Sequence, residues 1–387
     1  MCKKVLLVTR VSGFVPQFEM NNVKILQKMG YEVHYASNFE TVVYGADNER
    51  LKGTGIVCHD MPFCRSPFSG KVLTAYRKLK QLLLEEEFEL IHCHMPMTGV
   101  VTRMAAQAVR RQTKREVPVI YTTHGFHFFR GAPLKNWLYY LPEKWLARYT
   151  DRLITINEED FQRASGFKVR GKVEKIPGVG IENHKEDLGE ERRSSIREQK
   201  REELGVSASD YMLLSVGELN HNKNHLQVIK ALAETRDASI RYFICGMGAL
   251  HKELEEQVKK FGLEKQVRLL GYRSDIKELL LTADCFVFPS LREGLSVALM
   301  EAMRAGLPVV AKKIRGNVDL LADGQGGFLL KEGTPQEYME AVYRVKNDKD
   351  LAVSMGKWNQ ERVRKFSCEE VTARMERIYK EVLEWMV

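Results

Sequence analysis

Residues 289–308 combine two carboxylates with a predicted helix start, which suits a ligand that carries both phosphate and hydroxyl groups. An apolar strand leads into this segment, Ser296 can cap the helix that follows, and Gly306 can end it. The first N–H groups of a helix lack intrahelical partners and carry partial positive charge, so they attract phosphate. Glu293 precedes the helix and Glu301 lies in its second turn, where carboxylates accept hydrogen bonds from sugar hydroxyls. The alternative is that Glu301 is a solvated helix residue and Glu293 an ordinary loop acid.

Alternating strand-like and helix-like segments must position these residues. The first series predicts strands at residues 4–9, 31–36, 89–93, 118–123 and 152–156, and helices at residues 19–29, 71–87, 98–112 and 134–149. The second predicts strands at residues 211–216, 240–245, 266–270, 284–288 and 308–311, and helices at residues 224–234, 249–261, 275–282, 296–305 and 316–322. Repeated strand–helix units indicate an α/β fold with parallel sheets covered on both faces. Ligands bind beyond the carboxyl ends of such strands, so the loops there are candidate sites.

A change of composition near residue 178 separates the two series. Residues 174–182 carry a proline and two glycines, and residues 183–204 are highly charged and helix-prone. We therefore expect two doubly wound, Rossmann-like domains facing a cleft, at residues 1–177 and 178–365. Residues 366–387 follow, and most of them form an amphipathic helix. Its apolar face consists of Val371, Met375, Ile378, Val382 and Trp385.

Composition excludes several classes of protein. Of the 387 residues, 44% are hydrophobic and 29% charged, which is typical of a globular protein and not of a disordered one. The seven cysteines are scattered without a C-x-x-C pair, which argues against a disulfide framework or zinc ribbon and favours a reducing cytoplasm. No uncharged apolar run reaches the roughly 18 residues that a membrane-spanning helix needs, and the short apolar start does not make a signal peptide.

The spacing of Glu293 and Glu301 within EGLSVALMEAMRAGLPVV resembles the signature of retaining glycosyltransferases of family 4, which have the GT-B fold. The resemblance covers nearly the whole chain, includes several ordered motifs and is similar in detail to the exopolysaccharide and capsule-biosynthesis branch. It implies that residues 1–177 bind the acceptor and residues 178–365 the nucleotide sugar. It also implies that the terminal helix crosses back to the N-terminal domain.

The same resemblance implies roles for the residues around the predicted helix start. Glu301 would hold the ribose hydroxyls of a sugar nucleotide, and Glu293 would hold hydroxyls of the donor sugar. After Gly294, the backbone N–H groups of Leu295 and Ser296 would meet the diphosphate.

Other loops of the C-terminal domain also match the family pattern. Lys223, in the loop VGELNHNKN that begins near Gly217, matches the lysine that neutralises the leaving diphosphate. The alternative for Lys223 is an exposed loop lysine. The turn at Gly246 and the segment containing Tyr272 would line the base-binding pocket, where backbone contacts would read a uracil edge. Taken alone, the G-x-G at Gly246 is equally explained by a tight turn.

One position departs from the family pattern. Family members commonly carry an arginine directly after the glycine that aligns with Gly217, whereas this chain has Glu218. A carboxylate cannot clamp phosphate. Either one cation and the helix dipole suffice, or another base such as His221 takes the place of the arginine.

The N-terminal domain offers a glycine and a histidine at the ends of predicted strands. Gly13 permits close backbone approach and resembles the glycine loop that touches the donor phosphates. His124 matches a family histidine close to the reacting sugar, and its imidazole would hydrogen-bond a donor hydroxyl or the acceptor. The alternative is that His124 is a turn residue whose hydrogen bonds are made within the protein. His127 is a weaker candidate for the same role.

Metal-binding patterns are weak in this sequence. His92 and His94 should share one face of a strand, but no third ligand is identifiable from the sequence. The single Asp-x-Asp, at Asp348 and Asp350, lies in a charged stretch that indicates solvated surface. We therefore predict catalysis without a bound metal, and no other cofactor is expected.

The basic residues are concentrated in the N-terminal half. Residues 1–177 contain 27 Lys and Arg against 17 Asp and Glu, a balance of +10, while the remainder has 33 against 34, a balance of −1. Such asymmetry indicates an anionic partner for that half, against the plain reading of solubilising charge. That partner could be a nucleic acid, a phospholipid surface or a phosphorylated substrate, and no nucleic-acid recognition motif is present. Because basic residues recur in the apolar helical segments of this half, we expect it to dock on an anionic membrane surface.

Three basic clusters flank apolar positions in the expected helices of this half and are the predicted contacts with the membrane. The alternative is that the aromatic side chains pack in the core. The clusters are Lys71, Arg77, Lys78 and Lys80 around Val72, Leu73, Tyr76 and Leu79; Arg110, Arg111, Lys114 and Arg115; and Lys135 and Lys144 around Trp137, Tyr139, Tyr140 and Trp145.

The resemblance, together with these patterns, implies a retaining glycosyltransferase that moves a hexose or N-acetylhexosamine from a UDP-sugar to a saccharide or lipid-linked saccharide. It would act in the cytoplasm or on the inner face of the cell membrane, in surface polysaccharide synthesis. Two alternatives stay open, a UDP-sugar epimerase of the same fold and a non-catalytic sugar-nucleotide-binding partner in polysaccharide assembly.

Overall fold

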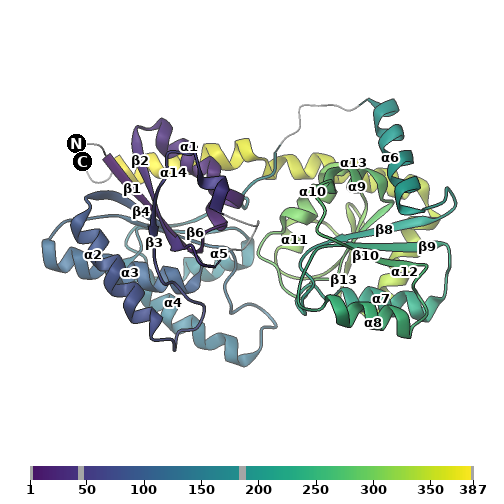
Figure 1. The fold of residues 1–387 in the computed structure, drawn as a ribbon, viewed down its shortest axis with the longest axis horizontal. Coiled ribbons are helices and arrows are strands. Elements are labelled where there is room, and N and C mark those ends of the chain that lie inside the picture. The colour runs from purple at the N-terminus through teal and green to yellow at the C-terminus, as the bar shows by residue number, and fades with distance from the viewer. Residues whose placement is uncertain (1–2, 42–47, 183–188, 385–387) are drawn as a thin grey trace. The chain divides into compact units, whose positions relative to one another are not determined.

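A computed structural model of the chain describes residues 3–41, 48–182 and 189–384 (Figure 1). The chain forms two compact units, unit 1 at residues 1–180 with 368–387 and unit 2 at residues 181–367. Each unit is built on a fully parallel sheet, of seven strands in unit 1 and six in unit 2. The predicted α/β class with two Rossmann-like sheets is therefore confirmed.

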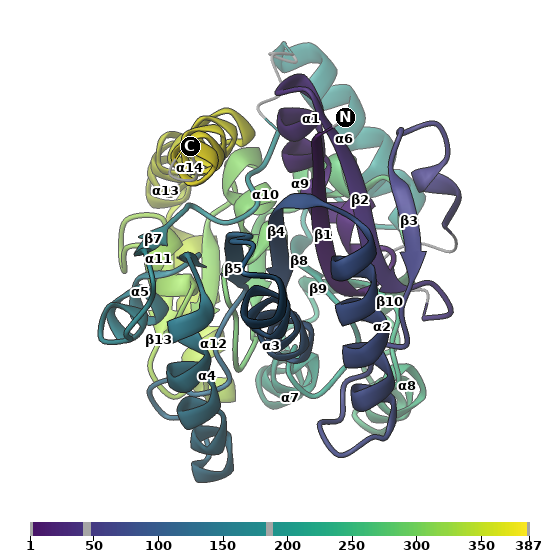
Figure 2. The same ribbon diagram turned by 90° about the vertical axis from the view of Figure 1, so that its left-hand side faces the viewer.

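In unit 1 the strand order β3-β2-β1-β4-β5-β6-β7 puts β1 and β4 at the centre. Helices α2 and α3 cover one face of this sheet, while α1 and α14 lie together on the other (Figures 1 and 2). The strands are β1 (Lys3–Val11), β2 (Tyr31–Asn38), β3 (Val57–Asp60), β4 (Phe88–His94), β5 (Val119–Thr123), β6 (Arg152–Thr155) and β7 (Lys172–Lys175). The helices are α1 (Met20–Lys28), α2 (Lys71–Glu85), α3 (Pro96–Thr113), α4 (Tyr140–Leu146), α5 (Glu158–Ser165) and α14 (Cys368–Glu384), with a π-helical turn at Val15–Glu19.

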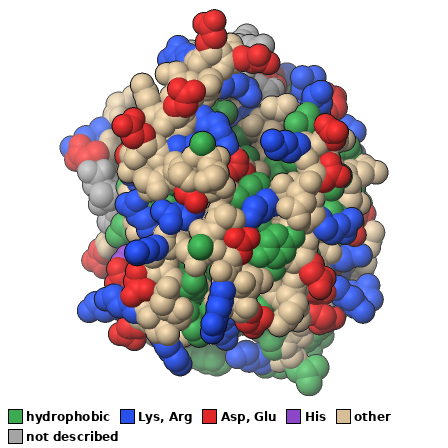
Figure 3. All heavy atoms as spheres, turned by 90° about the vertical axis from the view of Figure 1, so that its right-hand side faces the viewer, with side chains coloured by type: hydrophobic (Ala, Val, Ile, Leu, Met, Phe, Trp, Pro, Cys, Tyr) green, Lys and Arg blue, Asp and Glu red, His purple; other side chains and the backbone are tan. Residues whose placement is uncertain are grey.

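In unit 2 the strand order is β10-β9-β8-β11-β12-β13. The strands are β8 (Tyr211–Val216), β9 (Ile240–Cys245), β10 (Val267–Gly271), β11 (Cys285–Phe288), β12 (Val309–Lys312) and β13 (Gly327–Leu330). The helices are α6 (Glu190–Leu204), α7 (His225–Thr235), α8 (His251–Lys260), α9 (Ile276–Thr282), α10 (Val297–Ala305), α11 (Asn317–Leu320), α12 (Pro335–Asn347) and α13 (Lys349–Val363). Basic and acidic side chains interleave in Figure 3, as the near-neutral balance of this half of the sequence leads one to expect.

Several elements have no counterpart among the predicted segments. Strands β3, β7 and β13 are the edge strands of their sheets, and β7 has the sequence KVEK. Strands β3 (VCHD) and β7 lack the continuous apolar run that marks a strand buried on both faces, whereas β13 (GFLL) is apolar but only four residues long, so none of the three stands out in the sequence. Helices α5, α12 and α13 were likewise not predicted.

The predicted continuous helix at residues 134–149 is wrong in one respect. The segment is a 3-10 helix at Leu134–Tyr139, then α4, then a 3-10 turn at Ala147–Tyr149. Pro142 lacks the N–H that would bond to the carbonyl of residue 138, so the α-helical part can only begin with Pro142 in its first turn.

Helix α14 packs in unit 1. Four of the five predicted apolar positions, Val371, Met375, Ile378 and Val382, are buried, which confirms the amphipathic pattern. The fifth, Trp385, lies outside the described residues. In the part of the chain that the structure describes, no helix has both the length and the hydropathy to cross a bilayer.

Candidate functional site

Backbone hydrogen bonds join the loops that follow β8, β9 and β11 in unit 2. The N–H of Leu219 donates to the carbonyl of Met247 at 2.9 Å, and the N–H of Leu291 donates to the carbonyl of Asn222 at 2.8 Å. The side-chain amide of Asn222 donates to the carbonyl of Arg292 at 2.9 Å. The loops at the carboxyl ends of these parallel strands therefore form one connected surface.

Two glycines let these loops approach one another closely. A Cβ on Gly246, whose φ is +151°, would lie 1.9 Å from the carbonyl oxygen of Gly217. A Cβ on Gly316, whose φ is +83°, would lie 2.4 Å from the carbonyl oxygen of Gly294. The close backbone approach at Gly246 supports the tight-turn reading of that motif, and contact with a nucleotide base stays a prediction.

Lys223 and Glu293, which come from different loops, form an ion pair. Lys223 Nζ lies 2.8 Å from Glu293 Oε1, and the two side chains are only 19% and 13% exposed. The ammonium also lies 4.8 Å from the centre of the Phe288 ring at the end of β11. The pair as a whole carries no net charge, so the negative charge of Glu293 is offset by Lys223 where a diphosphate would approach.

Arg315 is a second cation beside Glu293, and sequence reasoning missed it. It is buried, and its Nε donates to the carbonyl of Glu293 at 3.1 Å. The one feature of the sequence that could have indicated Arg315 is the adjacent Gly316, which lets its loop approach the loop of Gly294 closely. By contrast, Glu218 and His221 are exposed, and His221 makes no hydrogen bond or ion pair within the described residues. Arg315 is thus a better candidate than His221 for the missing family arginine.

Helix α10 begins and ends as the sequence predicts. The Ser296 side chain accepts the N–H of Leu299 at 3.4 Å, and Gly306 ends the helix with a φ of +83°. Gly294 and Leu295, which precede this cap, are partly exposed, so the helix start is open to a ligand.

Glu301, in the second turn of α10, is a half-buried carboxylate. Burial raises its pKa, against a smaller opposing effect of Arg304. Within the part of the chain that the structure describes, this carboxylate makes no hydrogen bond. A desolvated acceptor without a partner is suited to bind ligand hydroxyl groups, which supports the predicted role without testing it. Tyr272, after β10, is 77% exposed and contributes no packing that would explain its position.

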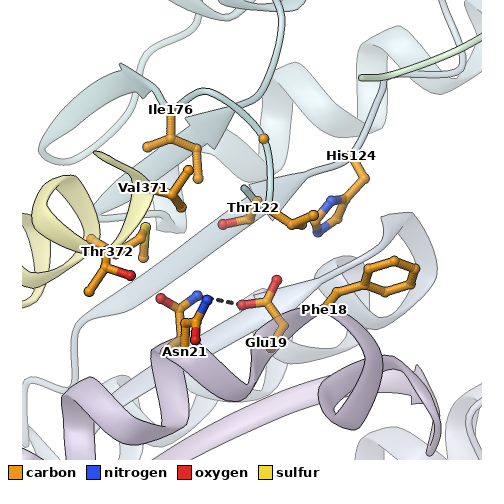
Figure 4. A pocket seen from close by; sticks show the side chains of 12 residues that line it. Phe18, Glu19, Asn21, Thr122, His124, Ile176, Val371 and Thr372 are labelled. Atoms are coloured by element: carbon orange, nitrogen blue, oxygen red, sulfur yellow. Dashed lines mark hydrogen bonds between the residues drawn. The ribbon is translucent and has the colours of Figure 1, made fainter. Parts of the chain in front are cut away.

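In unit 1, Glu19, His94 and His124 meet beneath the carboxyl ends of β4 and β5. His94 Nδ1 lies 3.2 Å from His124 Nε2 and 3.6 Å from Glu19 Oε1. The Phe14 ring packs on both imidazoles, with centroid distances of 5.4 and 5.0 Å. Figure 4 shows His124 and Glu19 pointing into one small pocket, which Phe18 also lines.

This cluster is held in its neutral form. Burial lowers the pKa of His124 to about 4 and that of His94 well below its usual range. Burial raises the pKa of Glu19 to about 8, although a hydrogen bond from Asn22 acts in the opposite direction. At neutral pH the imidazoles are uncharged and the Glu19 carboxyl is mostly protonated, so the cluster holds little buried charge.

His92 is a structural residue. As predicted, it shares a face of β4 with His94, and the ring centroids are 4.2 Å apart. Its Nδ1 bonds to the Tyr379 hydroxyl of α14 and its Nε2 to the Thr122 hydroxyl, both at 2.8 Å. Both ring nitrogens are therefore occupied.

The third potential metal ligand that the sequence did not reveal is Glu19. Among the described residues, one group of three potential ligands has its donor atoms within 4.8 Å of one another, namely Glu19, His94 and His124. However, His94 Nε2 is buried without a hydrogen-bond partner, whereas a metal-bound histidine normally donates its second nitrogen to a neighbour. Asp348 of the Asp-x-Asp caps α13, with its carboxylate accepting the Leu351 N–H at 2.9 Å. Metal independence stays a prediction.

Gly13 lies in the turn between β1 and the π-helical turn. It is buried, and its carbonyl accepts the N–H of Gln17 at 3.2 Å. Its predicted contact with donor phosphates is not tested by this geometry.

The second predicted basic cluster is partly wrong, because Arg110 is buried. Arg110 Nη2 donates to Asp151 at 2.5 Å, and its Nε donates to the carbonyl of Val117 at 3.0 Å. An arginine in the interior can satisfy its charge only with such partners, so Arg110 cannot face a membrane. The third cluster is different: Trp137, Tyr139 and Trp145 are 36%, 39% and 44% exposed, which excludes the alternative that the aromatic face is wholly packed in the core.

Comparisons with known proteins identify relatives over the length of the chain. Residues 196–362 match the sequence model described as glycosyl transferases group 1, and residues 20–177 match that of the glycosyl transferase 4-like domain. EpsD of Bacillus subtilis (strain 168), a protein named as a glycosyltransferase, is 36% identical over 384 residues, which is 98% of this chain and 97% of EpsD. An Escherichia coli enzyme is 30% identical over 303 residues, 75% of this chain and 74% of its own length. That enzyme is UDP-Gal:alpha-D-GlcNAc-diphosphoundecaprenol alpha-1,3-galactosyltransferase.

Solved structures share the fold at lower sequence identity. The crystal structure of Anabaena HepE in complex with UDP-glucose superposes with a TM-score of 0.77 at 21% identity, covering 98% of this chain and 99% of HepE. WaaG, a glycosyltransferase involved in lipopolysaccharide biosynthesis, gives a TM-score of 0.73 at 16% identity, covering 97% of this chain and 99% of WaaG.

Proposed function

The chain belongs to the group 1 glycosyltransferases of family 4, and from that premise we propose that it transfers a hexose or N-acetylhexosamine from a UDP-sugar to a lipid-linked saccharide in surface polysaccharide synthesis. The donor would bind unit 2 and the acceptor unit 1. The donor and acceptor classes are those in the name of the Escherichia coli relative. The polysaccharide context is supported by the capsular polysaccharide biosynthesis glycosyltransferase CapM of Staphylococcus aureus, which is 22% identical over 388 residues, 99% of this chain and 98% of CapM.

The observation that carries this proposal is the grouping of Lys223, Glu293 and the start of α10 in unit 2. A nucleotide sugar presents a diphosphate next to sugar hydroxyls, and this group offers an ammonium, a carboxylate and free helical N–H groups together. Glu301 adds an unpartnered acceptor one helical turn further on, suited to ribose hydroxyls. On donor binding, Lys223 would turn from Glu293 to the diphosphate and leave Glu293 to the sugar.

The proposed reaction retains the configuration at the anomeric carbon. The bond from that carbon to the diphosphate oxygen breaks, the acceptor oxygen forms its bond on the same face, and the departing phosphate oxygen takes the acceptor proton. Lys223 and the α10 N–H groups would stabilise the charge that grows on the diphosphate. These groups are most useful in the transition state, so they increase turnover more than donor affinity. In this scheme no metal is needed to neutralise the diphosphate.

Transfer is tested with the purified chain and a panel of radiolabelled UDP-hexoses and UDP-N-acetylhexosamines. Each donor is incubated alone, with a soluble saccharide and with a polyprenyl-diphosphate saccharide. We expect label to enter the lipid-linked product, with an anomeric configuration by NMR equal to that of the donor. Lys223→Ala, with exposed Lys260→Ala of α8 as the control, assigns the activity to this site.

Other outcomes separate the alternatives. Conversion of the donor without any acceptor would indicate an epimerase, and binding of donors without any turnover would indicate a non-catalytic partner. Transfer only to the soluble saccharide would support the glycosyltransferase activity but contradict the proposed lipid-linked acceptor.

A further inference from the structure

The segment at residues 134–145 of unit 1 carries a continuous row of exposed apolar side chains. Leu134, Leu138, Leu141 and Trp145 are 88%, 75%, 70% and 44% exposed. Leu138, Leu141 and Trp145 follow one another at spacings of three and four residues, as on one side of a helix that continues into α4, and Leu134 lies in the 3-10 turn before them. These four residues are called the docking face below. A row of four exposed large apolar residues in one short segment of a soluble protein marks an interaction site.

The opposite side of the same segment is fixed to the core of unit 1. Glu143 is buried and accepts a hydrogen bond from Arg103 of α3 at 2.8 Å, and the Tyr121 hydroxyl donates to it at 3.1 Å. Leu146 is buried next to it, and the Tyr140 ring packs edge-on against Phe128 at 5.3 Å. The segment therefore cannot roll over to bury its apolar row, and in Figures 1 and 2 α4 lies at the lower edge of unit 1.

The exposed charges of this segment itself are of one sign, and the acid next to it, Glu159 of α5, is paired with Arg163. Residues 130–149 contain four cations and one acid, and that acid is the buried Glu143. Each of the four cations, Arg130, Lys135, Lys144 and Arg148, is exposed. Arg148 lies over the Trp145 ring at 5.6 Å, which keeps a cation beside an aromatic side chain of the face.

We propose that the docking face inserts into the interfacial region of an anionic phospholipid bilayer, with Arg130, Lys135, Lys144 and Arg148 contacting the lipid phosphates. Leucine and tryptophan beside lysine and arginine are the composition of segments that lie in a membrane interface. A second copy of this chain is a poorer occupant, because two-fold pairing of the face would bring four like charges of each copy together. The proposal goes beyond the proposed reaction and does not depend on it, since lipid binding is measured without donor or acceptor.

The test is co-sedimentation of the full chain with vesicles of phosphatidylglycerol and phosphatidylcholine in equal parts, and with pure phosphatidylcholine. We expect binding to the anionic vesicles only, weakening as salt rises. The triple variant Leu134→Ser, Leu138→Ser and Leu141→Ser should lower the partition coefficient at least about tenfold, since three apolar side chains no longer insert. Lys135→Glu with Lys144→Glu should lower it by a similar factor.

Matched controls separate the docking face from general surface properties. Leu138→Ser is paired with Val353→Ser, an apolar residue of α13 that is 57% exposed. The charge variant is paired with Lys24→Glu and Lys28→Glu, two exposed lysines of α1 in the same unit. All of these side chains are exposed, so the variants should fold, and thermal unfolding checks this. Tryptophan emission should shift to the blue with anionic vesicles, and less so in Trp145→Phe.

Each contrary result overturns the proposal in a distinct way. Equal binding to neutral and anionic vesicles would show that the docking face does not require anionic lipid. Equal loss in the α1 lysine control would indicate unspecific electrostatics, and loss confined to reversal of Lys71, Arg77, Lys78 and Lys80 would place the contact on α2. A concentration-dependent dimer that Leu138→Ser abolishes, together with absent vesicle binding, would show that a second copy covers the face.

Discussion

Replacing Glu301 by alanine should weaken binding of UDP by about 10–100-fold. In the protein without ligand, the carboxylate is already half-buried and makes no hydrogen bond within the described residues, so its desolvation cost has been met during folding. A hydrogen bond to a charged acceptor contributes roughly 1.5–3 kcal/mol, and each 1.4 kcal/mol corresponds to about tenfold in affinity. Loss of the ribose contact therefore predicts the stated range.

The raised pKa of Glu301 adds a dependence on pH. The ionised carboxylate is the stronger acceptor, and burial makes it take up a proton at a higher pH than an exposed glutamate does. UDP affinity of the wild type should therefore fall as the pH is lowered from neutral, and Glu301→Gln should not show this part of the fall. UDP titrates too, but it does so equally for both proteins, so the ratio of their affinities isolates Glu301.

Isothermal titration calorimetry with UDP measures both effects without knowledge of the donor sugar. Glu340→Ala, at an exposed acid of α12, is the control for loss of a helical carboxylate. Wild-type affinity in Glu301→Ala would remove this residue from the donor site. Weakened affinity with an unchanged pH profile would show that Glu301 acts through the shape of α10 and not as an acceptor.

Three other expectations concern the same sites. Lys223→Ala should lower kcat more than donor affinity, because charge on the diphosphate grows toward the transition state. Near-normal turnover of this variant would indicate that Arg315 stabilises the diphosphate instead. The double variant Lys223→Ala with Arg315→Ala tests that possibility. Activity should survive EDTA, and loss that magnesium, manganese or zinc restores would contradict metal independence. Glu19→Gln should flatten the fall of unfolding free energy between about pH 5 and 8, because the folded chain holds this proton to about pH 8 and the unfolded chain releases it near 4.5. That difference in pKa corresponds to roughly 5 kcal/mol. Chemical denaturation at several pH values tests it, and a parallel decline of wild type and variant would contradict it.

Local patterns in the sequence determined much of this protein. The alternation of apolar strands with amphipathic helices predicted the α/β class, and Ser296 with Gly306 predicted both ends of α10. These features depend on residues a few positions apart, whose preferences act before any distant contact forms. The family signature at Glu293 and Glu301 is local in the same sense, since both residues belong to one loop and one helix.

Only the tertiary structure decided which distant residues meet. Lys223 reaches Glu293 across 70 positions, and Arg315 joins them from a third loop. Likewise, Glu19 comes beside His94, which no spacing in the sequence reveals. The reason is that parallel strands bring their carboxyl ends to one edge whatever their order in the chain, so the site is assembled by strand pairing. The solvent exposure of charged side chains also depends on the tertiary structure. In the sequence Arg110 and Lys144 both resemble surface cations, but Arg110 is buried against Asp151 whereas Lys144 is exposed.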